Sequence, residues 1–364
     1  MGLRKLRVEP NQLKPGCVVM KNVVGKTMKP ILPKDTVIKP IHINVLKHFQ
    51  IKEIEVANTF EDGEEFKPEL MEQQNVDENQ PPQTSFIEEY ETCVLETKQM
   101  FKLWQERSPI DYTRIRELLI PIVLKAEGNP KIIFSLHHLV EKEDYFYHHF
   151  VAKALISAFL AQKLNYSQGE RIQIALAAYL SDVGMAYLDE QLLYKNARLT
   201  EDEFKQVKNH PVYSYRKVEN IKALKYDAKI AILQHHERLD GSGYPLGLKQ
   251  PQIHLYSKII AVSDVFHAIT SERLYKQKQS PFKVAEDIQI DQAGKLDFEV
   301  VNKLVQSLSS FSNGTRVRLS DGREGEIVFM DKKEPTRPIV RLGHNDEMMV
   351  LKQNPQLHIE DILL

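Results

Sequence analysis

Apolar positions recur at helical spacing through the middle of the chain, which predicts a run of helices there. The segment RIQIALAAYL at 171–180 is apolar nearly all round, so this helix is expected to be buried on most sides. The sequence TEDE at 200–203 has the pattern of a capping box, a threonine N-cap with a glutamate three residues later. Two further segments each present one apolar stripe of an amphipathic helix. The first stripe comprises Val151, Ala154, Leu155, Ala158 and Phe159, and the second Leu255, Ile259, Val262, Phe266 and Ile269.

Near both ends of the chain the pattern changes to short β-branched runs and to period-two alternation. A Pro-Gly turn at 15–16 precedes such a run, and residues 31–57 predict a short strand, a helix and a closing strand. The segment TRVRLSDGREGEIVFM at 315–330 alternates around an Asp-Gly hairpin turn, and two more strands follow it. We therefore expect a mainly α protein, in which an all-α domain is flanked by a small N-terminal α/β module and a small C-terminal β module resembling a barrel.

The segment between the first module and the helices is acidic, rich in Gln and Asn, and carries a double proline. Such a composition cannot bury a core, so a polar linker is predicted. The expected organisation is an N-terminal module at 1–57, the linker at 58–85, the helical domain at 86–310 and the β module at 311–364.

Composition narrows the class of protein. The chain has 364 residues, 27% of them charged, and a formal net charge of −1, so no overall field would recruit a nucleic-acid polymer or an anionic membrane. Cys17 and Cys93 are the only cysteines, which excludes a disulfide framework and a thiolate zinc site. Neither a secretory signal nor a span of about 20 apolar residues is found. We expect a cytoplasmic protein.

The segment HHERLDGSGYP at 235–245 places two imidazoles at the end of a helix and a glycine-rich turn after them. His235 shares a helix face with Ala231, and His236 shares one with Ile232, so both rings point toward the apolar side, roughly 100° apart. They are candidate metal ligands. The alternative is one packed histidine and one half-exposed histidine.

Two carboxylates also occupy unfavourable positions. Asp182 follows the most apolar helix, at the end where the helix dipole disfavours a negative charge, and Asp264 lies inside an apolar helix. Asp182 could instead emerge into solvent. If both are buried they need a counter-charge, and a divalent metal is the simplest one. His149 and His210 stand at helix ends and could complete a set of imidazole and carboxylate ligands, which suits Fe, Mn or Zn.

These residues resemble the pattern of the HD superfamily of metal-dependent phosphohydrolases, and HHERLDGSGYP resembles the signature of its HD-GYP branch. The resemblance covers about 140–285, including VSDVFHAITSERLY at 262–275. It implies hydrolysis of cyclic di-GMP to pGpG and GMP in bacterial signalling, by hydroxide that two metals activate. It also implies that the first metal is held by His149, Asp182, Asp264 and the histidine of the HD pair, and the second by Asp182, His210, His235 and His236.

The resemblance further implies roles for the loop. Asp182, His236 and Arg238 would act in catalysis. Gly241 and Gly243 would let backbone approach the substrate, Tyr244 and Pro245 would shape a guanine pocket, and Arg273 would contact phosphate. Arg238 and Arg273 could equally form surface or loop-bracing ion pairs.

The chain departs from the family pattern at two positions. Ser181 holds the place of the HD histidine, and Met185 replaces a lysine three residues after the aspartate. We therefore expect one tightly bound Fe or Mn and a second site that is weak or absent. His148 is expected to be an exposed neighbour rather than a substitute ligand, because it lies about 100° around the helix. The remaining histidines near the motif are read as structural or exposed, namely His137, His138, His254 and His267.

Three functions follow from these residues. The first is a cyclic di-GMP phosphodiesterase of reduced activity, and the second is a catalytically degenerate cyclic di-GMP sensor. The third is a phosphohydrolase of another nucleotide. Besides cyclic di-GMP or a related nucleotide, the possible partners are a second copy of the chain, in a homodimer, or a signalling protein.

Overall fold

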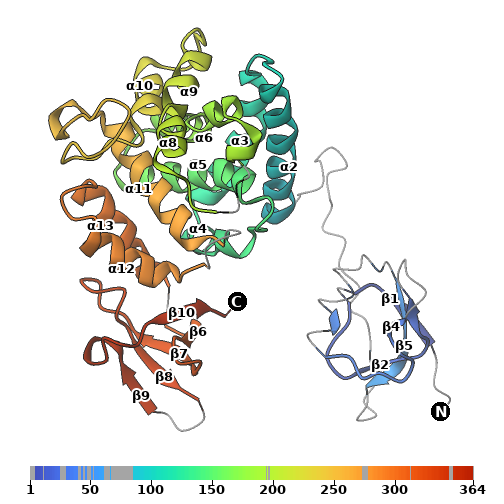
Figure 1. The fold of residues 1–364 in the computed structure, drawn as a ribbon. Coiled ribbons are helices and arrows are strands. Elements are labelled where there is room, and N and C mark those ends of the chain that lie inside the picture. Colours follow the sequence, from blue (N-terminus) through green and yellow to red (C-terminus); the bar gives the residue numbers. More distant parts are fainter. Residues whose placement is uncertain are drawn as a thin grey trace. The chain divides into compact units, whose positions relative to one another are not determined.

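The computed structural model describes residues 5–10, 12–24, 30–39, 42–43, 46, 51, 53–60, 66, 85–193, 195, 197–272, 278–311, 313–343 and 347–363. The chain divides into two compact units, Met1–Gln83 and Thr84–Leu364 (Figure 1). Among the described residues, no helix is both long and apolar enough to cross a bilayer. Cys17 and Cys93 are both buried and free.

The N-terminal unit is built from short antiparallel strands around its own apolar core. The predicted closing strand forms, but it extends to Phe60, past the predicted end of the module at residue 57. Most of the helix predicted before it lies outside the described residues. One sheet has the order β1-β5-β2, and β3 pairs with β4. The strands are β1 (Lys5–Val8), β2 (Cys17–Val19), β3 (Val23–Val24), β4 (Pro30–Leu32) and β5 (Ile54–Phe60).

The second unit is helical up to residue 310, as the apolar periodicity predicts. Its α-helices are α2 (Phe86–Gln105), α3 (Tyr112–Glu127), α4 (Pro130–Ser135), α5 (Tyr145–Lys163), α6 (Gln168–Leu180), α7 (Glu190–Leu193), α8 (Glu201–Val207), α9 (His210–Val218), α10 (Tyr226–Gln234), α11 (Leu255–Thr270), α12 (Pro281–Asp291) and α13 (Phe298–Ser307). The short 3₁₀ helices η1 (Leu136–His138), η2 (Val183–Tyr187) and η3 (Gln250–Gln252) lie between them, and η4 (Leu308–Ser310) follows α13. A fifth, η5 (Leu351–Gln353), lies among the C-terminal strands.

Helix α5 is the centre of this domain. It packs against α2, α3, α4, α6 and α11, so every residue from Tyr147 to Ala161 is buried. The single apolar stripe predicted for this helix therefore understated its burial. In α11, Ile259, Val262 and Phe266 are buried as predicted, but Leu255 is 56% exposed because it stands at the first residue of the helix.

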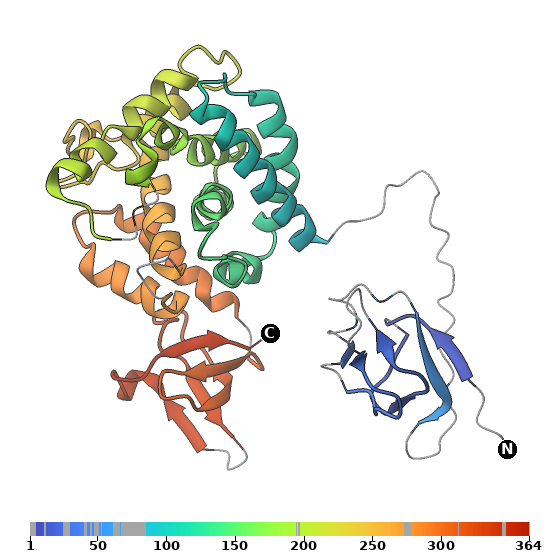
Figure 2. The same cartoon turned by 45° about the vertical axis from the view of Figure 1, so that its right-hand side comes forward.

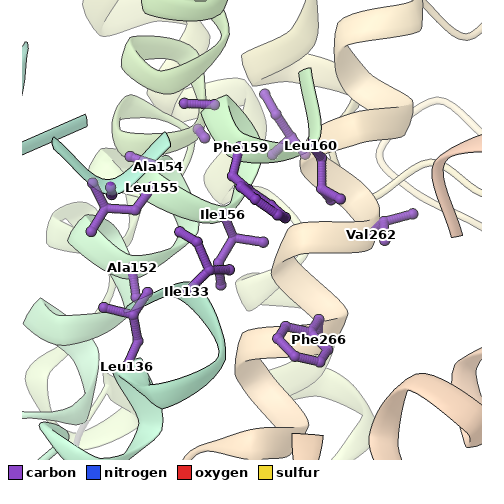
Figure 3. Packing of buried hydrophobic residues seen from close by; sticks show 14 of the residues in the cluster. Ile133, Leu136, Ala152, Ala154, Leu155, Ile156, Phe159, Leu160, Val262 and Phe266 are labelled. Carbon is purple, nitrogen blue, oxygen red and sulfur yellow. The ribbon is translucent and has the colours of Figure 1, made fainter. Parts of the chain in front are cut away.

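The core between α4, α5 and α11 fixes the helices that carry the candidate ligands (Figure 3). Phe159 and Leu160 of α5 lie beside Val262 of α11, and Ile133 of α4 lies near Ile156 (Figure 3). Helix α6 is buried from Ile174 to Leu180, and Thr200 forms the predicted capping box with Glu203 at the start of α8.

Five antiparallel strands follow the last helix, visible in red in Figure 2. Their order is β10-β6-β7-β8-β9, an open sheet, so closure into a barrel is not confirmed. The strands are β6 (Arg316–Leu319), β7 (Glu324–Phe329), β8 (Ile339–Leu342), β9 (Glu347–Val350) and β10 (Ile359–Ile362). The predicted Asp-Gly turn joins β6 to β7, and β10 was not predicted. The sheet is tied to α12 by an ion pair between Arg337 and Glu286 at 2.7 Å.

Candidate metal centre

The six predicted ligands come together inside the helical domain, each at or near a helix end or on a buried helix face. Their donor atoms fall into two groups that share Asp182, and within each group the atoms lie within 4.8 Å of one another. The first group comprises Asp182, His210, His235 and His236, and the second His149, Asp182 and Asp264. Asp182 therefore stays in the buried site and does not emerge into solvent; its side chain is 7% exposed.

In the first group, three lone-pair atoms converge on one point. The Nε2 atoms of His210 and His235 lie 3.2 and 3.6 Å from Oδ1 of Asp182, and 3.3 Å from each other. Each ring donates its Nδ1–H to a backbone carbonyl, of Val207 at 2.7 Å and of Ile232 at 2.8 Å. A neutral imidazole carries one N–H, so in the neutral rings both Nε2 atoms present lone pairs toward the carboxylate. A cation between these atoms would satisfy all three.

The protonation of this group favours metal ligation. Burial lowers the pKa of His235, despite the opposing effect of Asp182, and burial together with the neighbouring His235 holds the pKa of His236 well below its ordinary value. Burial alone would raise the pKa of Asp182, but the Lys153 ammonium and the neighbouring His210 and His235 rings outweigh burial and hold this pKa well below its ordinary value. Neutral imidazoles and an ionised carboxylate are the forms that bind metals.

The second group is connected differently. His149 Nε2 lies 3.0 Å from Oδ1 of Asp264, and its Nδ1 lies 2.9 Å from Nδ1 of His267. The Nε2 atom of His267 in turn meets the hydroxyl of Ser271 at 3.2 Å. One assignment of protons satisfies the whole chain: Ser271 donates to His267, His267 to His149, and His149 to Asp264. This group needs no additional cation to complete its hydrogen bonds.

Lys153 is the residue of this centre that the sequence prediction missed. It follows His149 by one helical turn on α5, its side chain is 0% exposed, and its Nζ donates to Oδ2 of Asp182 and lies 3.7 Å from Oδ1 of Asp264. Its spacing from His149 was the only signal in the sequence. Burial alone would raise the pKa of Asp264, but the hydrogen bond from His149 and the charge of Lys153 hold it well below its ordinary value.

The side chains at the two positions that depart from the family pattern make other contacts. Ser181 is fully buried, and its hydroxyl donates to the carbonyl of Ala178 at 2.9 Å. Met185 is partly buried against the apolar core. His148 is buried rather than exposed, because its ring packs on Tyr90 with Nδ1 3.2 Å from the phenol oxygen. It is not among the residues of either candidate group.

The loop after His236 is held by a buried carboxylate. Glu237 is 2% exposed, and its two oxygens accept the N–H groups of Leu246 at 2.7 Å and Leu248 at 2.9 Å. A Cβ on Gly243 would stand 2.3 Å from the backbone nitrogen of Arg238, so this position requires glycine for packing within the loop. Gly241 forms a turn at a φ of 86°. The role of Glu237 was not predicted.

The other loop residues are placed as follows. The Tyr244 ring stacks on His236 with centroids 4.6 Å apart, and Pro245 beside it is partly buried. Arg238 donates from Nη1 to the carbonyls of Glu237 at 2.9 Å and His235 at 3.4 Å, so this side chain contributes to holding the loop. Arg273 lies outside the described residues.

The histidines assigned no role in the motif divide into two kinds. His254 caps α11 by accepting the N–H of Tyr256, and His138 pairs with Asp361 of β10 at 3.1 Å. His137 is buried beside His138. His137, His138 and Asp361 form a further group whose donor atoms lie within 4.8 Å of one another, apart from the six predicted ligands. His267, in contrast, contacts the predicted ligand His149 directly.

Comparisons with known proteins agree with this geometry. The HD domain family matches residues 135–300. A cyclic di-GMP phosphodiesterase of Pseudomonas aeruginosa is 31% identical over 67% of this chain and 58% of its own length. The cyclic di-GMP phosphodiesterase PdeB of Borreliella burgdorferi is 26% identical over 59% of this chain and 56% of its own length. The chain thus spans just over half of each relative.

A solved structure shares the fold. It is an HDG"Y"P protein of Bdellovibrio bacteriovorus, with a TM-score of 0.51 and 16% identity, and the match covers 83% of this chain and 98% of that one. At this identity the likeness shows the fold alone. With the family match, the related sequences and the residues gathered around Asp182, the chain belongs to the HD-GYP family.

Proposed function

We propose that this chain is a metal-dependent phosphodiesterase that hydrolyses cyclic di-GMP to pGpG and GMP, with reduced activity. The observation that carries the proposal is the convergence of His210 Nε2, His235 Nε2 and Asp182 Oδ1 beside the Tyr244 loop. The relatives named as cyclic di-GMP phosphodiesterases supply the substrate class.

The residues present fit a divalent metal on the side of Asp182 that faces His210 and His235. His210, His235, His236 and Asp182 would hold it, and this set of imidazoles and a carboxylate suits Fe or Mn. When bound, the ion would acidify water and polarise the phosphodiester.

The chain's own groups prepare that chemistry. The carbonyls of Val207 and Ile232 fix the tautomers of His210 and His235, so that both Nε2 atoms face the same point. Glu237 holds the loop, and the Tyr244 ring covers one face of His236. We propose that Tyr244 and Pro245 contact a guanine base and that the glycine turn lies along the phosphate backbone. Arg238, which holds the loop through Nη1, would act in catalysis with Asp182 and His236.

A second function has a specific observation in its favour. Ser181 and Met185 provide neither the histidine nor the lysine of the family pattern, which favours a degenerate cyclic di-GMP sensor that signals through its terminal modules or a partner protein. A second copy of the chain, in a homodimer, could take the place of that partner protein in signalling.

One experiment separates these functions. Chain loaded with Mn²⁺ or Fe²⁺ is incubated with cyclic di-GMP, and pGpG and GMP are quantified against a His236→Ala control; binding is measured by calorimetry. Product above the control supports the enzyme. Binding without product supports the sensor. If cyclic di-GMP is neither cleaved nor bound, the third function is favoured, and a panel of other cyclic dinucleotides and nucleotides would test it.

A further inference from the structure

The two candidate metal groups that share Asp182 are not equally open to a cation. In the group of His149, Asp182 and Asp264, the Nζ atom of Lys153 already contacts one carboxylate and lies 3.7 Å from the other. Both carboxylates are buried, and Lys153 has no exposed surface at all. A buried ammonium requires such partners, because an unpaired charge in the interior is strongly disfavoured.

We propose that the Lys153 ammonium is the resident cation of this group, taking the place of one metal, so that the chain binds a single divalent ion. This inference rests on the proposed function only in placing that ion between Asp182, His210, His235 and His236.

The positions of the protons also favour Lys153, and not a metal, as the cation of the His149 group. His149 reaches a metal only by giving up the hydrogen on Nε2 that it donates to Asp264 in the satisfied chain from Ser271 through His267. A metal on this side would also need Oδ1 of Asp264 and Oδ2 of Asp182 at about 2.0–2.2 Å. Lys153 already donates to the second of these oxygens.

Charge balance points the same way. Asp182 and Asp264 bring two negative charges, and Lys153 brings one positive charge. One divalent ion beside Lys153 leaves the centre with a single net positive charge, whereas two such ions would leave three within a buried site. Like charges at this separation repel strongly where little water screens them. Ser181 supplies no further ligand for a second ion, because its hydroxyl donates a hydrogen bond to the carbonyl of Ala178.

The first test is the number of ions bound by the unaltered chain. Metal-free protein is titrated with Mn²⁺ by calorimetry, and the bound metal is counted by mass spectrometry. We expect one ion per chain and the six-line spin-resonance spectrum of an isolated Mn²⁺. Two ions per chain with a spin-coupled spectrum would overturn the inference.

The second test removes the ammonium. Lys153→Met keeps the length and apolar stem of the side chain, and we expect a second Mn²⁺ to bind and the Mn²⁺-dependent rise in Tm to exceed that of the unaltered chain. Lys163→Met, on the same helix but in its last turn and over the Phe159 ring, is the matched control and should still bind one ion. A folded Lys153→Met chain that still binds one ion contradicts the inference.

A third variant keeps Lys153 and so does not depend on the folding of the Lys153→Met chain. His235→Ala removes a ligand of the open group, and we expect Mn²⁺ affinity to fall at least 100-fold, with no ion retained on the His149 side. Retention of one tight ion would overturn the inference. Cleavage is measured separately: an unaltered chain that binds one ion but cleaves no cyclic di-GMP would contradict the proposed function and leave this inference standing.

Discussion

The two sides of Asp182 carry similar residues but different hydrogen-bond partners. On one side, His210 and His235 donate their Nδ1–H groups to backbone carbonyls, so their unprotonated Nε2 atoms point toward the Asp182 carboxylate. On the other, His149 sits in a chain of donors that ends on Asp264, and Lys153 supplies a positive charge. The comparison shows that the hydrogen-bond partner of Nδ1 determines whether the Nε2 atom of a histidine carries a lone pair, which can bind a metal, or a hydrogen, which is donated to a carboxylate.

The strongest way to break this comparison is to remove one imidazole from each side. His210→Ala should lower Mn²⁺ affinity and cyclic di-GMP cleavage at least ~100-fold, because a direct ligand is lost. His149→Ala should lower Mn²⁺ affinity less than ~10-fold. Calorimetry and product analysis measure both. Equal losses in the two variants would show that the sides are equivalent.

The next largest effect concerns the loop beside the open side. Glu237→Ala leaves the N–H groups of Leu246 and Leu248 without their acceptor, so the free energy of unfolding should fall by about 3 kcal/mol. Cleavage should fall as Tyr244 loses its position over His236. Glu237→Gln, which keeps one acceptor oxygen, should lose about 1 kcal/mol. Chemical denaturation measures both, and identical losses would mean that the carboxylate does not hold the loop.

Restoring a histidine at position 181 sharpens the comparison further. Ser181 is fully buried, so Ser181→His should lower the free energy of unfolding by about 2 kcal/mol through overpacking. It should not add a second Mn²⁺ while Lys153 remains. Metal counting on Ser181→His and on Ser181→His with Lys153→Met checks this, and a second ion in the single variant would contradict it.

The smallest expected effect is the loss of stability in acid that comes from His137, a buried histidine outside the Asp182 centre. Burial, with His138 and Lys278 nearby, lowers the pKa of His137 to about 3 from 6.5. The unfolded chain therefore takes up a proton first, and stability present above pH 6.5 is lost as the pH falls toward 3. Between pH 7 and 5.5 this loss is about 1 kcal/mol. Denaturation of the His137→Gln chain should show a decline smaller by that amount, and an unchanged decline would contradict it.

Much of the helical domain could be predicted because its apolar spacing and capping patterns are local. A shared counter-charge for Asp182 and Asp264 was expected from the cost of burying carboxylates in apolar helices, whereas the set that joins His149 to them was implied by the family resemblance. Lys153 escaped prediction because a lysine within an apolar helix gives no sign of where its amine ends. The partner of His149 on α11, His267, is likewise set by packing between helices.

The terminal modules show the same limit. The Asp-Gly turn and the alternation of apolar and polar residues in β6 and β7 depend on residues that are close in sequence, so they could be predicted. Strand β10 pairs with β6 across the whole length of the sheet module, and whether the strands close into a barrel depends on which edges meet. Neither property is contained in a short window of sequence.

Lys153 also changes how the domain can mature. Because its ammonium is part of the polypeptide, the repulsion between Asp182 and Asp264 is relieved as soon as α5, α6 and α11 assemble. We therefore expect the chain to reach its native packing around these carboxylates without a metal, so that uptake of the proposed ion would not be required for folding.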